Sequence, residues 1–309
     1  MARRKAKSPM RRITRAFDRK ALARICEMHE DDFAERYGME TYVIPERNGD
    51  NDRYYYQDNG SNVLAVAHLD TVGAHEERGC YFLNTAGGEV VYSRALDDRL
   101  GAYIILDLLP KLGIQYDILL TVGEEDGMST AEFFEPLKEY DWMIEFDRGG
   151  TDVVMYQFED QFTVDLVKAS GARVGEGIFS DICYLEHLGV KGFNWGVGYR
   201  DYHGPRAHAY LDDTLMMVNN FLRFHAANAG RPMPHTYRPP VSWWDRKGWE
   251  RDGWGDDVLD PDVALWEEPG AEVMPEGEEF AEGRNLMADL IEEYPSLAQI
   301  NIALGQDEV

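Results

Sequence analysis

The sequence predicts an α/β fold with a central, mostly parallel sheet flanked by helices. Over residues 41–229, short apolar segments alternate with segments of helical spacing, which is typical of parallel strands joined by helices. Three of the apolar segments are followed closely by His68, Glu124 and Asp147. Because ligands bind at the carboxyl ends of the strands in such sheets, these side chains mark the predicted functional edge of one catalytic domain.

The predicted strands are short apolar runs bounded by polar residues. They lie at residues 63–67, 116–122, 141–146, 152–156 and 192–197. Helical spacing of apolar residues, together with capping residues, predicts the helices. They lie at residues 99–109, 129–139, 181–188 and 213–227. We expect Pro110 to end the first of them, and Ser129 or Thr130 to cap the second.

Residues 1–40 are predicted to form a basic, helical N-terminal arm. The first 24 residues hold ten lysines and arginines and a single acid, Asp18. Helical spacing relates the apolar residues Phe17, Leu22, Ile25, Cys26 and Phe33. The favoured interpretation is a solvated helix that packs on the core. The alternative is an arm that binds an acidic partner or the acidic C-terminal segment of the chain.

Residues 230–309 are predicted to form an acidic, tryptophan-rich extension that begins with a proline-rich linker. From residue 229 onward there are 19 acidic and 6 basic residues, together with five tryptophans. Acidity alone would indicate disorder, but tryptophan rings usually pack against something. We therefore expect a segment that wraps around the catalytic unit or a neighbouring subunit, which allows a homo-oligomer formed through this extension.

The composition narrows the class of protein. A net charge of −26 opposes binding of nucleic acid through the overall field. No apolar run approaches the ~18 residues of a membrane span, and the basic N-terminus lacks the apolar region of a secretory signal. The three cysteines are widely spaced, include no CxxC pair and suit a reducing compartment. We predict a cytoplasmic protein without a membrane partner.

A histidine and an acid follow the first predicted strand. Alternation along the strand puts His68 and Asp70 on the same side of the chain. Asp70 can then bind the second ring nitrogen of His68 and fix its tautomer as a metal ligand. The alternative is a structural pair, because a motif this short is weak alone.

Pairs of adjacent acids precede the first predicted helix and follow the second strand. Asp97 is assigned as a carboxylate that bridges two metals; the alternative is a helix N-cap, which Asp98 could supply. Glu125 is assigned as a metal ligand and Glu124 as the general base, since neighbouring residues point in different directions and acid–base chemistry needs separated proton affinities. The alternative for this pair is two exposed loop acids.

The last two candidate ligands, Asp147 and His203, lie further toward the C-terminus than the acids described above. Asp147 follows the third strand, and the glycine pair shortly after it lets the backbone approach a ligand closely. His203 lies in a loop before the last helix and is assigned as the final ligand, with His208 as its rival. Two imidazoles and several carboxylates are a suitable ligand set for two divalent metals.

In this order, the motifs resemble those of the co-catalytic dizinc metallopeptidase superfamily, which includes aminopeptidases, peptidase T-like tripeptidases and aminoacylases. The likeness spans residues 60–228 and is closest to the deblocking, shell-forming aminopeptidase branch. It implies a zinc-peptidase, phosphorylase/hydrolase-like fold. It also implies that His68, Asp97 and Asp147 hold one zinc, and that Asp97, Glu125 and His203 hold the other.

The resemblance also bears on substrate binding and on domain content. Ser180 and Asp181 resemble a segment that lines the pocket in several branches, and Arg200 and His208 are further candidate substrate-binding residues. Many relatives carry a second domain inserted after the first histidine or after the acid of the third strand. Here both gaps are too short for a domain of ~100 residues, so no inserted lid domain is expected.

The predicted activity is metal-dependent hydrolysis of an amide bond in a peptide, as an aminopeptidase, with a metal-bridging water activated by Glu124. The cofactors would be two divalent ions, Zn²⁺ in the first place, with Co²⁺ or Mn²⁺ also suited to these ligands. An alternative is an amidohydrolase or deacylase of N-acyl amino acids or cell-wall fragments, whose carboxylate Arg148, Arg200 or Arg206 could bind. A second alternative is a non-catalytic binding or structural module, which the presence of every proposed ligand argues against.

Overall fold

The computed structural model describes residues 9–45, 47, 52–72 and 79–236. The chain divides into two units, residues 1–239 and 240–309, and the second lies outside the described residues. The predicted acidic extension is therefore not described beyond residue 236. Among the residues that the structure describes, no helix has the length and apolar character needed to cross a membrane.

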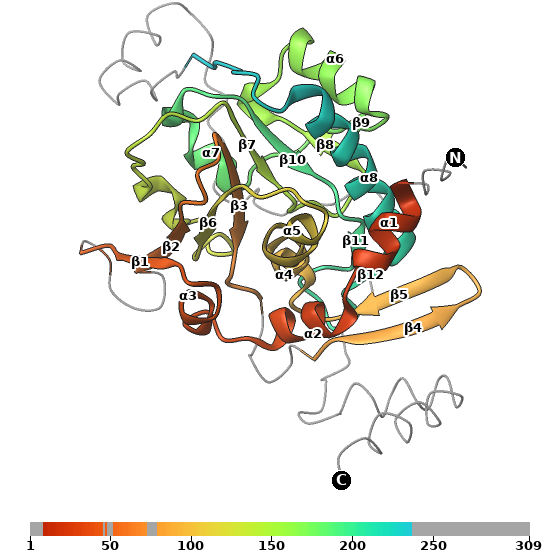
Figure 1. Cartoon of the computed structure of the whole chain (residues 1–309). Coiled ribbons are helices and arrows are strands. Elements are labelled where there is room, and N and C mark those ends of the chain that lie inside the picture. Colours follow the sequence, from red (N-terminus) through yellow and green to blue (C-terminus); the bar gives the residue numbers. More distant parts are fainter. Residues whose placement is uncertain (1–8, 46, 48–51, 73–78, 237–309) are drawn as a thin grey trace, which may run out of the picture. The chain divides into compact units, whose positions relative to one another are not determined.

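A mixed sheet of eight strands forms the centre of the described unit, in the order β1-β2-β6-β3-β7-β10-β8-β9 (Figure 1). Its strands are β1 (Glu40–Val43), β2 (Arg53–Gln57), β3 (Val63–His68), β6 (Asp117–Thr121), β7 (Trp142–Glu145), β8 (Asp152–Val154), β9 (Arg173–Val174) and β10 (Gly192–Trp195). The four central strands β6, β3, β7 and β10 are mutually parallel. The predicted fold class and all five predicted strands are confirmed.

The parallel strands are buried along their whole length, as their continuous apolar sequences predict. In the register of β3 with β6, His68 lies opposite Thr121, so the last residue of one strand pairs with the last of the other. The two following segments therefore leave the sheet at the same edge.

A second, antiparallel sheet was not predicted. Its strands are β4 (Tyr81–Thr85), β5 (Gly88–Tyr92), β11 (Tyr199–Arg200) and β12 (His208–Tyr210), in the order β11-β12-β5-β4. In Figure 1, β4 and β5 form a hairpin that projects from the body. These strands are short and half exposed, so no apolar run reveals them. Among the described residues, neither gap between the site motifs contains an inserted domain.

The helices differ from the prediction in extent. They are α1 (Pro9–Ala16), α2 (Arg19–Glu27), α3 (Asp32–Tyr37), α4 (Leu96–Tyr103), α5 (Leu109–Lys111), α6 (Gln161–Ser170), α7 (Asp181–Tyr184) and α8 (Leu211–Asn228). The sequence missed α6, although Asp160 and Thr163 form a capping box at its start. The helix predicted at 181–188 is α7 followed by a 3₁₀ turn.

Two predicted helix boundaries are wrong for reasons that involve proline. Pro110 does not end its helix, because a π-helical segment precedes it and Pro110 lies in the first turn of α5, where its missing N–H needs no partner. The helix predicted at 129–139 is only a 3₁₀ turn, Thr130–Phe133, which the Ser129 side chain caps. Pro136 is incompatible with continuation of that helix.

The described part of the N-terminal arm packs on the core as three helices rather than one. Its apolar side chains are buried in the common core. Arg99, two residues after the predicted bridging acid, is buried against this arm: it donates to Glu30 (3.0 Å) and to the Ile25 carbonyl (3.2 Å) and lies over the Phe33 ring. The arm therefore supports the helix that begins beside Asp97.

At the amino ends of the parallel strands, buried Asp117 accepts hydrogen bonds from the main-chain N–H groups of Asn59 and Ser61 and pairs with Lys138. We expect Asp117→Ala to lower the free energy of unfolding by about 3 kcal/mol, because it leaves partly buried donors without an acceptor. Asp58→Ala is the matched control, since Asp58 also pairs with Lys138 but is exposed, and its cost should be clearly smaller. Urea unfolding measures both, and equal costs would contradict this account.

Candidate metal centre

The first group of predicted ligands meets at the carboxyl edge of the sheet. His68, the last residue of β3, has its Nε2 3.2 Å from Asp97 Oδ1 and 3.8 Å from Asp147 Oδ1. All three side chains are buried or nearly so, and their ligand atoms lie within 4.8 Å of one another. One imidazole and two carboxylates in this arrangement can hold a divalent cation.

The second group shares one residue with the first. His203 Nε2 lies 3.2 Å from Asp97 Oδ2 and 2.8 Å from Glu125 Oε2. Asp97 therefore offers one oxygen to each group, Oδ1 toward His68 and Oδ2 toward His203. Its backbone is not helical, although it falls within the first turn of α4.

Asp70 holds this arrangement in a different way from the predicted one. The Nδ1 atom of His68 lies 2.9 Å from the main-chain carbonyl of Asp70, whereas the nearest Asp70 carboxylate oxygen is 3.6 Å away. The carboxylate instead accepts a hydrogen bond of 3.0 Å from the main-chain N–H of Glu125. Asp70 thus orients His68 with its backbone and the loop after β6 with its side chain.

Glu124 belongs to neither group but lies beside them. Its Oε2 is 3.9 Å from His68 Nε2, and its side chain is 15% exposed, which leaves it accessible to a ligand. Burial raises the pKa of Glu124 to about 8; the charge of His68 opposes this shift, and those of Asp147 and Asp181 add to it. A carboxyl group with this pKa can exchange a proton near neutral pH.

The protonation of the cluster without cations provides a test of whether metals fit. Burial by itself would lower the pKa of His68, but the nearby carboxylates of Asp147, Asp70 and Asp97 raise it well above its usual value. Burial and the charge of Asp97 raise the pKa of Asp147 to about 6. Glu125 Oε1 is buried without a hydrogen-bond partner. Concentrated negative charge, bound protons and a buried oxygen without a partner all fit a site built for cations.

The remaining predicted site residues lie outside the two groups. Asp181 is buried and accepts a hydrogen bond from Thr121 at the end of β6, close enough to Glu124 to affect its pKa. Arg200 pairs with Asp213 (3.0 Å) at the surface.

His208 is also separate from the cluster. Its Nδ1 lies 2.8 Å from the Arg206 carbonyl, and its ring stacks on Tyr92 at 5.4 Å between centroids. Among the described residues it belongs to no group that could hold a metal ion, whereas His203 does.

Sequence reasoning missed the residues that fix Asp147. Asn194 accepts a hydrogen bond from the Asp147 main-chain N–H (3.0 Å) and donates one to its carbonyl (2.7 Å), and the Tyr199 hydroxyl donates to Asp147 Oδ1. Asn194 is a lone amide in the buried strand β10, directly beside β7 in the sheet. A polar residue inside a buried strand was the available signal, because such a group needs a partner.

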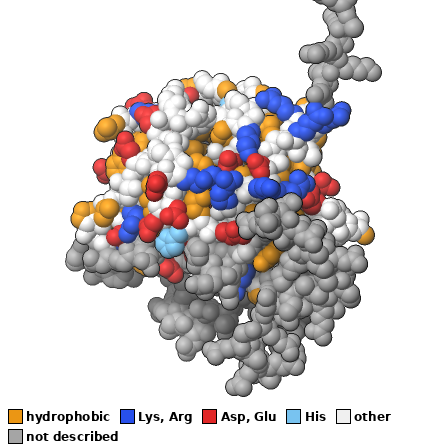
Figure 2. All heavy atoms as spheres, turned by 60° about the horizontal axis from the view of Figure 1, so that its bottom comes forward, with side chains coloured by type: hydrophobic (Ala, Val, Ile, Leu, Met, Phe, Trp, Pro, Cys, Tyr) orange, Lys and Arg blue, Asp and Glu red, His pale blue; other side chains and the backbone are white. Residues whose placement is uncertain are grey.

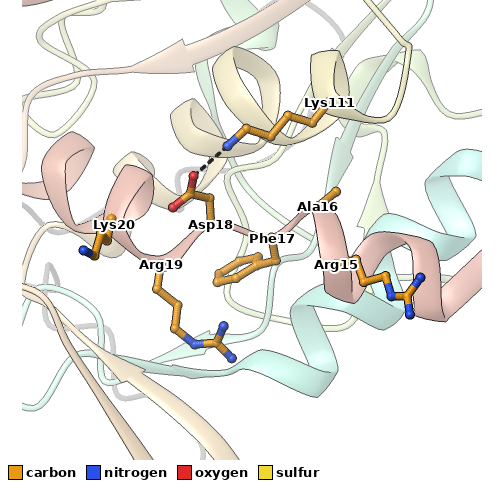
Figure 3. A pocket seen from close by; sticks show the side chains of 7 residues that line it. All are labelled: Arg15, Ala16, Phe17, Asp18, Arg19, Lys20 and Lys111. Atoms are coloured by element: carbon orange, nitrogen blue, oxygen red, sulfur yellow. Dashed lines mark hydrogen bonds and ion pairs between the residues drawn. The ribbon is translucent and has the colours of Figure 1, made fainter.

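A basic groove lies apart from these ligands, on the N-terminal helices. It has a volume of about 560 Å³ and is lined by Arg15, Ala16, Phe17, Asp18, Arg19, Lys20 and Lys111. Figure 3 shows the Asp18 carboxylate turned toward Lys111, at 3.0 Å, and Arg19 is paired with Glu89. Figure 2 likewise shows lysine and arginine side chains with acidic ones beside them. The groove contains none of the predicted site residues.

An α/β sheet that carries a paired histidine–carboxylate cluster at its carboxyl edge defines a candidate two-metal centre. No model of a known family and no curated protein matches the sequence. Solved structures do match: a tripeptidase from Staphylococcus aureus has a TM-score of 0.52 at 10% identity, and the match covers 70% of this chain and 97% of that chain. Aminopeptidase PepT from Bacillus cereus has the same score and identity, covering 70% and 98%.

The chain therefore has the fold of these peptidases, as the motifs imply. A TET aminopeptidase from a marine sediment archaeon matches with a TM-score of 0.43 at 13% identity. That score supports no choice between branches, so the likeness to the shell-forming branch stays a prediction.

Proposed function

We propose that this protein is a two-metal peptidase, in which His68, Asp97 and Asp147 hold one divalent cation and Asp97, Glu125 and His203 hold the other. The observation that carries the proposal is the position of Asp97, whose two carboxylate oxygens face two different histidines. A helix N-cap, the alternative role of this acid, would not bring a second imidazole to its other oxygen. Zn²⁺, Co²⁺ and Mn²⁺ all suit these ligands.

The chain's own groups supply the remaining chemistry. When bound, the two cations would lower the pKa of a water molecule and polarise the carbonyl of the scissile amide. Glu124 would take the proton of the attacking water and deliver it to the leaving amine. Asp70 keeps His68 and the loop of Glu125 in position. Asn194 and Tyr199 keep Asp147 in position through side-chain hydrogen bonds.

Hydrolysis of peptides, as an aminopeptidase, is favoured over deacylation of N-acyl amino acids. The similar folds belong to a tripeptidase and an aminopeptidase. The deacylase alternative needs an arginine to bind a substrate carboxylate. Arg148 pairs with Asp152 (2.6 Å) and Arg200 pairs with Asp213, which leaves the exposed Arg206 for this role. A panel of aminoacyl anilides and N-acyl amino acids, assayed with metal-loaded protein, separates the two activities.

Metal binding should release protons and stabilise the protein. At pH 7 the metal-free cluster holds protons, because the pKa of His68 is raised and that of Glu124 is about 8. A cation displaces protons from its ligands and their neighbours, so affinity should increase with pH. Calorimetric titration with Zn²⁺ in buffers of different ionisation enthalpy measures the release, and an excess of ~100 times Kd should stabilise the fold by about 2.7 kcal/mol. Binding without proton release would contradict this description of the cluster.

A further inference from the structure

Several of the exposed large apolar side chains lie close in sequence to the predicted site residues. Among the described residues, eleven large hydrophobic side chains are exposed. Five of them lie within three positions of a predicted site residue, namely Val72, Met128, Ile178, Phe179 and Tyr202. Exposed apolar groups gathered beside a polar cluster mark a surface that binds a ligand.

Contacts through Tyr184 bring the segment of Phe179 to the turn that carries Met128. The Phe179 ring packs edge-on against Tyr184 of α7, with 4.9 Å between centroids. The Tyr184 hydroxyl donates a hydrogen bond of 2.7 Å to the carbonyl of Gly127, the residue before Met128. We name Met128, Ile178 and Phe179 the apolar rim.

The apolar rim is tied directly to the candidate catalytic carboxylates. The turn after β6 is closed by hydrogen bonds from Gly127 N to the Glu124 carbonyl and from Met128 N to the Gly123 carbonyl, each 2.8 Å long. One turn therefore carries Glu124 and Met128. On the other element, Phe179 is two residues before Asp181, which accepts a hydrogen bond from Thr121, the last residue of β6 and three positions before Glu124.

We propose that the apolar rim selects substrates with an apolar side chain next to the scissile amide, so that Met128, Ile178 and Phe179 determine specificity. The inference rests on the proposed function. Each rim side chain has apolar surface that a bound substrate could bury. The exposed fractions are 53%, 88% and 39% for Met128, Ile178 and Phe179. Burial of apolar surface favours leucyl or phenylalanyl groups over charged ones, for which the same contact costs desolvation. Methionine adapts its shape, so the surface accepts several apolar side chains.

The test compares leucyl, phenylalanyl, lysyl and glutamyl anilides with metal-loaded protein. We expect kcat/KM to be at least about tenfold higher for the two apolar substrates, and Phe179→Ser to reduce this ratio by roughly tenfold. Phe162→Ser is the matched control, because Phe162 is 37% exposed but lies on α6 against Arg231. Met128→Gln tests the rim from the other element if Phe179→Ser does not fold, as judged by its thermal unfolding.

The outcomes separate this inference from the function on which it rests. Hydrolysis without an apolar preference overturns the inference alone. So does an apolar preference that both Phe179→Ser and Met128→Gln leave unchanged, or that Phe162→Ser reduces equally. If the metal-loaded wild-type protein hydrolyses none of the anilides, the proposed function fails, and the inference fails with it.

Discussion

Glu124→Gln should abolish hydrolysis while the protein keeps its metals. The Glu124 side chain lies in neither ligand group, so its loss removes the proposed proton carrier and leaves both groups complete. The amide cannot accept the proton of water, and loss of a general base costs on the order of 10²–10⁴ in rate. Metal content by elemental analysis and anilide hydrolysis, measured on the same preparation, give the two results.

Glu139→Gln is the matched control, since Glu139 is an exposed glutamate outside the site, and it should keep full activity. Activity retained in Glu124→Gln would exclude Glu124 as the base. Loss of metal in this variant would instead show that Glu124 is a metal ligand, together with His68, whose Nε2 lies 3.9 Å from Glu124 Oε2.

Asp97→Asn should impair both metal positions at once. The amide keeps one oxygen but replaces the other with an NH₂ group, which repels a cation, so one of the two groups must lose a ligand. Because Asp97 faces both histidines, we expect metal content well below two per chain and loss of hydrolysis. Asp147→Asn alters the first group only, and the site of Glu125 and His203 should then retain its metal.

Asp201→Asn controls for the loss of negative charge. Asp201 is an exposed acid two residues before His203 and is part of neither ligand group, so its replacement should leave metal content unchanged. Equal metal loss from Asp97→Asn and Asp147→Asn would show that Asp97 is not shared. In that case the proposed two-metal arrangement would be wrong even if the protein binds one ion.

The central strands and the ligand positions could be predicted from sequence because both depend on local pattern. Continuous apolar runs predict buried parallel strands, and parallel strands bring their following residues to one edge. The α-helical and 3₁₀ segments were predicted less well. Pro110 lies within a helix, whereas the 3₁₀ turn ends before Pro136. The effect of a proline depends on whether the neighbouring turn needs its N–H group.

The antiparallel sheet could not be predicted, because its short strands bury little apolar surface and pair over long sequence distances. In that sheet β12 pairs with β5, placing Ala209 opposite Val91. This sheet also carries His208, whose ring stacks on Tyr92, away from the two ligand groups. The ambiguity between two nearby histidines is therefore a question of tertiary pairing.

The sequence by itself determined the fold class, the central strands and the residue types of the candidate centre, because periodicity and strand-end positions are local properties. Tertiary structure alone decided which histidine reaches Asp97, that Asp70 holds His68 through its carbonyl, and that α7 contacts the turn after Glu124. Each of these depends on distances between segments far apart in the chain. Such distances follow from how the elements pack and pair, which no local pattern specifies.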